Sequence, residues 1–263
     1  MALQPSPDYR NLLVGAGVLF TDLLNPTTLA RSGWRHMGNI DQLQLQVTPD
    51  LIKKYSSMDP SKPLYDQLNR RIDAQLKITA AEITPENAAM HLSGTTAAYT
   101  QPATSVTGEA VFASTVPGSY FFTSKLGPHT AVTVHFGASV GVLGTDYVLV
   151  DGAAGLYQIT LTTILTGAVT IDYTPPAIVA NQGAIDLSSS LAPVITCAFK
   201  YVGNPTRGRR RIVEIWKAVV TPDGAHDFIT DEYGNLVLNA AVLVDSVNHP
   251  TSPLFSDRWF PVS

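Results

Sequence analysis

Two short stretches in which polar and apolar residues strictly alternate constrain the fold of this chain most. Between residues 42 and 47, glutamine alternates with leucine or valine. Between residues 72 and 79, Ile, Ala, Leu and Ile alternate with Asp, Gln, Lys and Thr. Because successive side chains of a strand point to opposite faces, each stretch predicts a half-buried β-strand with one polar and one apolar face. We expect the two strands to pair.

The segment between these strands, residues 50–71, shows no sustained periodicity. It follows Pro49 and contains Pro60 and Pro63. We interpret it as a long connection that holds a short helical turn at most. A connection of this length in a compact domain is usually functional or is ordered by a partner.

A helix start follows the second strand, in the sequence Thr84-Pro85-Glu86-Asn87. A threonine hydroxyl can accept a hydrogen bond from the first turn, proline suits the first helical position, and a carboxylate is favourable at the positive end of the helix. Residues 88–92 supply the apolar side chains, and Gly94 predicts the end. We therefore expect one short helix.

The composition changes at residue 95. From there to residue 176 the chain has almost no Lys or Arg, and short apolar stretches are separated by Gly, Pro, Ser and Thr. The strands expected there are residues 109–113, 120–123, 131–136, 146–150, 157–163 and 168–173. Short strands at regular spacing with turn residues between them predict a small, Ig-like β-sandwich.

After a polar linker at residues 180–190, the sequence again contains charged residues and strand-like patterns, as in its first 95 residues. Strands are expected at residues 194–202, 211–220 and 236–244. We therefore predict a discontinuous domain, residues 11–98 and 181–263, that carries an inserted β-sandwich, residues 99–180. Residues 1–10 are predicted to form an extended N-terminal arm.

The composition limits the classes of function that this chain can have. Only 14% of the 263 residues are charged and 45% are apolar, which favours a surface that meets other protein. The net charge of -4 gives no broad basic footprint for binding nucleic acid. Residues 1–10 lack a secretory signal and no apolar stretch is long enough for a membrane helix, so we expect a soluble protein made in the cytoplasm.

No pattern of catalytic, metal-binding or cofactor-binding residues is found. The single cysteine, Cys197, excludes an intrachain disulfide and lies in an apolar stretch typical of a core strand. The six histidines form no close pair, no Gly-x-Ser-x-Gly motif is present, and Gly15 and Gly17 lack the third glycine of a dinucleotide loop. We therefore expect no enzyme activity, no metal and no cofactor.

One cluster of basic residues stands at a turn that leads into a strand. It contains Arg207, Arg209, Arg210 and Arg211. Such a cluster suits either phosphate groups or an acidic patch on another subunit. Because the chain as a whole is acidic, we favour the contact with another subunit.

The order of these features resembles that of the tail tube (major tail) proteins of long-tailed bacteriophages. The features are a glycine-bearing first strand, the sequence Gly-Trp-Arg-His-Met-Gly-Asn-Ile at residues 33–40, the alternating strand, the long connection, the second strand, the short helix and the charged C-terminal strands. The resemblance covers roughly residues 10–95 and 190–263.

This resemblance implies a mainly β, tail-tube-type sandwich or barrel subunit built from two packed sheets and one short helix. Such subunits commonly form hexameric rings that stack into a hollow tube in the virion, through which DNA passes without specific binding. The implied partners are other copies of the chain, the tape measure protein, the tail terminator and the distal tail or baseplate proteins, with no membrane. The inserted sandwich would lie on the tube exterior, which favours a non-contractile tail.

The resemblance also assigns residues to surfaces. The residues implied to line the channel are Gln42, Gln44, Gln46, Asp73, Gln75, Lys77 and Thr79. The residues implied to contact other subunits are Asp50, Lys53, Lys54, Tyr55, Asp59, Tyr65, Arg70, Arg207, Arg209, Arg210 and Arg211. Two alternatives stay open: the Tyr, Ser and Thr content of the insertion also suits a glycan- or cell-surface-binding β-sandwich protein, and a secretion-system tube protein would share the fold without such an insertion.

Overall fold

The computed structural model describes residues 12–25, 27–58, 60–163, 165, 167–189 and 194–260, so the predicted arm at residues 1–10 lies outside the described residues. The fold is mainly β, as predicted, with 52% of the chain in strands and one α-helix. The chain divides into two compact units. The core unit comprises residues 1–96 and 187–263, and the inserted unit comprises residues 97–186. The boundaries predicted from the sequence were 98/99 and 180/181, close to the observed 96/97 and 186/187.

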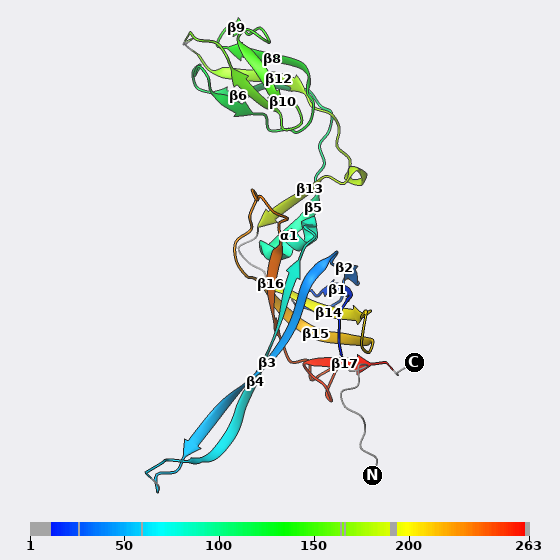
Figure 1. The fold of residues 1–263 in the computed structure, drawn as a ribbon. Helices are drawn as coiled ribbons and strands as arrows, with labels where there is room; N and C mark the ends of the chain where they lie inside the picture. Colours follow the sequence, from blue (N-terminus) through cyan, green and yellow to red (C-terminus); the bar gives the residue numbers. More distant parts are fainter. Residues whose placement is uncertain are drawn as a thin grey trace. The chain divides into compact units, whose positions relative to one another are not determined.

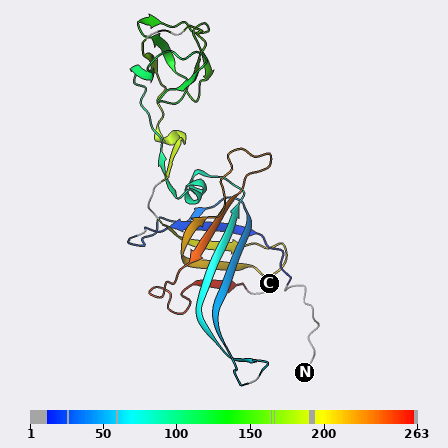
Figure 2. The same ribbon diagram turned by 90° about the vertical axis from the view of Figure 1, so that its left-hand side faces the viewer.

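The core unit is built on one antiparallel sheet of eight strands, seen in Figures 1 and 2. Their order is β2-β1-β14-β15-β16-β4-β3, and β17 also pairs with β15. The strands are β1 (Gly17–Leu23), β2 (Arg35–His36), β3 (Ile40–Tyr55), β4 (Leu64–Ala80), β14 (Ile195–Gly203), β15 (Arg211–Pro222), β16 (Leu236–Val242) and β17 (Phe255–Trp259).

The sheet forks at β15. Residues 211–215 of this strand pair with β17, whereas residues 218–222 pair with β16 on the same edge. The two branches diverge, and Figure 2 shows β3, β4 and β16 crossing over β1, β14 and β17. The family resemblance implied two packed sheets; in the structure the two packed layers are the branches of one forked sheet.

The core of this unit lies between the two branches. Leu19 and Phe199 on one branch join Leu76, Ile78 and Leu238 on the other in a single buried cluster. Burial of such side chains is the main stabilising contribution to a domain of this size. The apolar face of β4 therefore packs mainly against β1 and β14, because the helix contributes only Met90 to the cluster.

The predicted helix is confirmed as α1 (Pro85–His91). The Thr84 hydroxyl accepts a hydrogen bond from the Asn87 N–H, as the sequence suggested, at 3.2 Å. The helix ends one residue earlier than expected: Ser93 adopts the left-handed conformation, with φ of 52°, and Gly94 begins strand β5 (Gly94–Ala98). Asn87 is fully buried and its side-chain amide donates to the Met37 carbonyl at 2.8 Å, which fixes the helix to the chain entering β3.

The inserted unit is a β-sandwich with a core of its own. One sheet has the order β10-β11-β7 and the other β6-β12-β8-β9. The strands are β6 (Val106–Phe112), β7 (Tyr120–Phe122), β8 (Thr130–Phe136), β9 (Ser139–Val140), β10 (Tyr147–Asp151), β11 (Leu156–Ile159) and β12 (Val169–Thr174). Phe121, Tyr157 and Ile171 are among the side chains buried between the sheets. All six strands predicted for this region are present.

Two predictions about connections are wrong. Residues 50–71 are not a loop, because β3 runs on to Tyr55 and β4 begins at Leu64, so most of this segment is a long β-hairpin. The polar linker at residues 180–190 contains a 3-10 turn, η2 (Ala180–Gln182), and strand β13 (Ile185–Ser189), which pairs with β5.

Candidate assembly surface

A polar face of β3 and β4 brings together the residues predicted to line a channel. The register places Gln42 opposite Thr79, Gln44 opposite Lys77, Gln46 opposite Gln75, and Thr48 opposite Asp73. Six of the seven predicted side chains are exposed, and Thr79 is half-buried. The pairing of the two alternating strands, expected from sequence, therefore gathers all seven on one surface.

This polar face carries little unpaired charge. The Lys77 ammonium lies 3.1 Å from the Asp223 carboxylate. Asn239 of β16 lies opposite Lys77 on the other side and continues the polar surface. The face therefore offers amide and hydroxyl groups and the Asp73 carboxylate, and no free cation among these residues.

The edge of β3 is unpaired. Among the described residues, β3 pairs only with β4, so 16 residues of strand have one side free. Natural sheets normally cover or interrupt such an edge because its N–H and C=O groups can pair with another chain. This edge is the part of the core unit best suited to add a strand from a partner.

The β3–β4 hairpin extends beyond the rest of the sheet, and we call residues 48–73 the hairpin arm (Figure 1). The neighbouring strand β16 pairs with β4 only from Ala74 to Ala80. Ten residues of β4 therefore project past β16, which at the usual rise of a strand is about 30 Å. A two-stranded ribbon of this length is marginal on its own in water, so it needs either internal clamps or a partner.

A charged clamp lies at the base of the hairpin arm. The Asp50 carboxylate accepts hydrogen bonds from Arg70 at 2.7 and 3.0 Å and from Arg71 at 2.9 Å. Two guanidinium groups share one carboxylate, so the cluster keeps a net positive charge. Asp50 and Arg70 were predicted to contact other subunits; in the structure of the single chain they contact each other.

The outer part of the hairpin arm exposes both cations and large apolar side chains. Lys53, Lys54, Tyr55 and Tyr65 are exposed, as expected for contact residues, whereas Asp59 lies outside the described residues. Met58 and Leu68 are also exposed and were not predicted. These two residues could have been identified from the sequence, because they are large apolar residues in a segment rich in charged residues and proline.

The arginine cluster lies in the turn between β14 and β15 and has partners within the chain. Arg210 donates to the Gly203 carbonyl at 3.1 Å and stacks on the Phe260 ring. Arg211 forms an ion pair with Asp257 at 3.4 Å and stacks on the Trp259 ring. Two of the four arginines thus fix the C-terminal strand, and Arg207 and Arg209 stay exposed.

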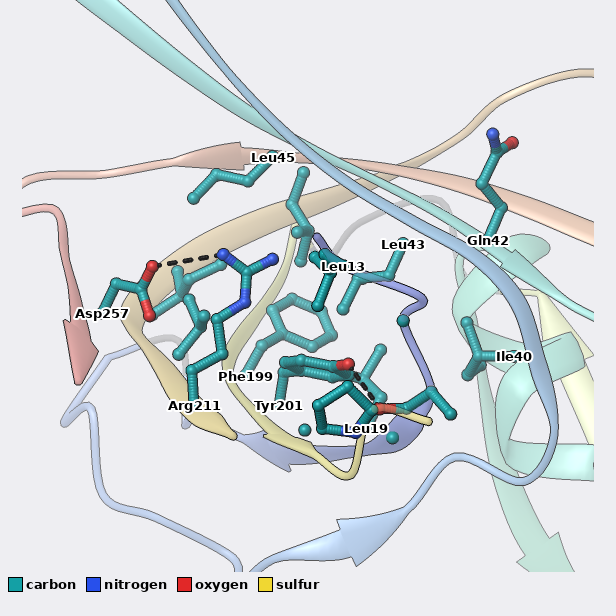
Figure 3. A pocket seen from close by; sticks show the side chains of 18 of the residues that line it. Leu13, Leu19, Ile40, Gln42, Leu43, Leu45, Phe199, Tyr201, Arg211 and Asp257 are labelled. Atoms are coloured by element: carbon teal, nitrogen blue, oxygen red, sulfur yellow. Dashed lines mark hydrogen bonds and ion pairs between the residues drawn. The ribbon is translucent and has the colours of Figure 1, made fainter. Parts of the chain in front are cut away.

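A groove of about 500 Å³ opens between β3 and the other branch of the sheet (Figure 3). Leu43 and Leu45 of β3 face Leu19, Phe199 and Tyr201 across it. The Tyr201 hydroxyl donates to the Ala16 carbonyl at 2.8 Å. The groove is thus the open side of the core, bordered by the free edge of β3.

The described residues contain no group of three or more His, Cys, Asp or Glu side chains that could hold a metal ion. Cys197 is fully buried, as predicted, and burial raises the pKa of its thiol to about 11. The thiol is therefore protonated at neutral pH and unreactive. The lack of enzyme activity stays a prediction.

A protein-family model described as protein of unknown function UCP028589 matches residues 12–256. The chain belongs to this family. No curated protein matches the sequence. The family match covers residues of both the core unit and the inserted unit. In the part of the chain that is described, no helix is long and apolar enough to cross a membrane.

Proposed function

We propose that the chain is the tube-forming subunit of the tail of a long-tailed bacteriophage, which assembles into stacked rings and conducts DNA into the host. The observation that carries the proposal is the polar face of β3 and β4. It places glutamines directly opposite Gln75, Lys77 and Thr79, with the buried core behind them.

The chemistry of this face suits passive contact with DNA. A protein grips DNA mainly through Lys and Arg that displace counterions from phosphates. Here the lysine of the face, Lys77, is bound to Asp223, and the remaining groups are amides, hydroxyls and a carboxylate. A channel lined in this way would repel or ignore phosphate and let DNA slide.

The free edge of β3 supports assembly into a closed ring. When each copy supplies a strand to the edge of the next, a sheet can close into a barrel that has no edges left. The groove beside β3 would then be covered by the neighbouring copy. In this proposal the inserted unit lies outside the tube, because a second domain would block the channel.

A second function is supported for the inserted unit alone. Tyr120 and Phe122 on β7 are both exposed, and Phe122 is 66% exposed. Aromatic rings on an open sheet face are suited to stack on the apolar faces of sugar rings. Adsorption to bacteria that is unchanged by deletion of residues 100–178 would exclude this role and leave the tube proposal standing.

Electron microscopy of the purified chain at high concentration tests the main proposal. We expect rings or tubes with a central channel. Monomers under every condition tested, together with no rings of this protein in phage particles, would overturn it.

A further inference from the structure

The loop between β15 and β16, residues 223–235, combines negative charge with exposed apolar side chains. It contains three aspartates and one glutamate and no Lys or Arg. Phe228, Ile229 and Tyr233 all lie on the surface, and Ile229 and Tyr233 are 95% and 99% exposed. We call this segment the acidic loop.

The hairpin arm has the complementary character. Over residues 48–73 it carries five Lys and Arg against four Asp. Lys53 and Lys54 form no ion pair among the described residues. Met58 at its tip is 96% exposed, and Tyr65 and Leu68 are exposed beside it. Large apolar side chains that project from a surface in this way mark contact sites.

The two segments lie at opposite ends of the same strands. Leu236, at the end of the acidic loop, lies opposite Ala80, whereas the hairpin arm leaves the sheet beyond Ala74 (Figure 1). β4 has 17 residues, so the acidic loop and the tip of the arm are separated by about 50 Å along the strand. The arm therefore cannot meet the acidic loop of its own chain.

We propose that the hairpin arm of one copy docks on the acidic loop of another copy, head to tail along the strand direction. The lysines of the arm would meet the carboxylates of the loop, and Met58, Tyr65 and Leu68 would cover Phe228, Ile229 and Tyr233. A contact between two different surfaces of the same chain is heterologous, and when it runs head to tail along one direction it repeats from copy to copy as an open stack.

This inference rests on the proposed function and specifies it: the contact is the one that stacks successive rings. Opposite charges speed and orient the encounter, while the apolar side chains supply most of the stability. Together they give the stack a direction, because an arm fits a loop and not another arm.

Cross-linking between two differently substituted copies tests the contact. One full-length variant carries Met58→Cys and the other Ile229→Cys, and the two are mixed with a short bismaleimide reagent. The native thiol of Cys197 is fully buried and does not compete. The control pairs Met58→Cys with Val247→Cys, which is 89% exposed but lies in the loop that follows β16, at the same end of the sheet as the arm.

We expect the Met58/Ile229 pair to form dimers at least about tenfold faster than the control pair, because docking raises the local concentration of the two thiols. Tyr233→Cys in place of Ile229→Cys should cross-link to Met58→Cys at a similar rate. Lys53→Glu with Lys54→Glu should slow the reaction, and Asp227→Lys with Asp231→Lys on the partner should restore it.

The outcomes separate this contact from the proposed function. Tubes in the microscope without preferential cross-linking would overturn the contact and leave the tube standing. Preferential cross-linking without rings would support the contact and overturn the tube. Equal rates for both pairs, whether or not tubes form, would overturn the inference.

Discussion

Gln46 and Gln75 are direct cross-strand neighbours on the exposed face of the β3–β4 hairpin, and the adjacent pair is Gln44 and Lys77. The residues between them in each strand, Leu45 and Leu76, point into the core. The same two strands therefore form part of the core with one face and present an amide-rich surface with the other.

Adding positive charge to this face should hinder DNA passage. Gln44→Lys with Gln46→Lys would place two cations where the structure has amides, and each new phosphate contact strengthens DNA binding in a salt-dependent way. We expect slower DNA ejection from particles that carry this variant, most marked at low salt. The control, Val140→Lys with Val142→Lys at exposed positions of the inserted unit, should eject at the normal rate; equal slowing in both would argue against a channel face here.

The core between the two branches of the sheet should dominate the stability of the core unit. Ile78 is fully buried, and its replacement by alanine should lower the free energy of unfolding by about 2–5 kcal/mol. Gln75→Ala, three residues earlier on the exposed face, should change it by less than about 0.5 kcal/mol. Urea unfolding measures both, and similar losses would contradict the assignment of the two faces.

The inserted unit should depend on Gln101. This side chain is buried; its amide donates to the carbonyls of Leu126 and Pro176 at 2.7 and 2.8 Å, and its oxygen accepts from the Leu126 N–H at 3.0 Å. Gln101→Ala removes all of these bonds and leaves buried groups unpaired, which should cost about 2–4 kcal/mol.

Calorimetry shows which of the two units the Gln101→Ala variant destabilises. Because each unit has its own core, we expect two transitions, of which Gln101→Ala lowers only one. Gln158→Ala, a half-buried glutamine of the same unit, serves as the control and should leave both transitions nearly unchanged. A single transition that shifts as a whole would show that the units unfold together.

Cys197 should make the core unit sensitive to alkaline pH. Burial raises the pKa of its thiol from 9.0 to about 11, so the folded state holds the proton over a range in which the unfolded chain releases it. Stability from this difference is fully present below pH 9 and is lost as the pH rises from about 9 to about 11. Cys197→Ala should remove this part of the pH dependence of urea unfolding, and an unchanged profile would refute the assignment.

The two alternating strands of the core unit and their pairing could be predicted because their periodicity is local. The alternation at residues 42–47 and 72–79 follows directly from the two faces of a sheet with one face in the core. The hairpin arm could not be predicted in this way, because neither of its faces is covered within the chain. Pro49 and the register shifts between Asp50 and Leu51 and between Lys54 and Tyr55 also interrupt the alternation there.

The arginine cluster shows a second limit. Its charge suggested a partner subunit, yet Arg211 pairs with Asp257, which is 46 residues further along the chain. Strand β17, which holds this aspartate, has only five residues, three of them polar, and was not predicted from the sequence. Partners that are distant in sequence and meet only through the fork of the sheet are not visible in local patterns.

A cryo-electron microscopy reconstruction of the assembled protein tests the central claim most directly. We predict a hollow tube whose lumen is lined by Gln44, Gln46, Gln75 and Lys77, with the edge of β3 paired to a neighbouring copy. A reconstruction in which this face lies on the outside of the assembly, or is buried between subunits, would contradict the account.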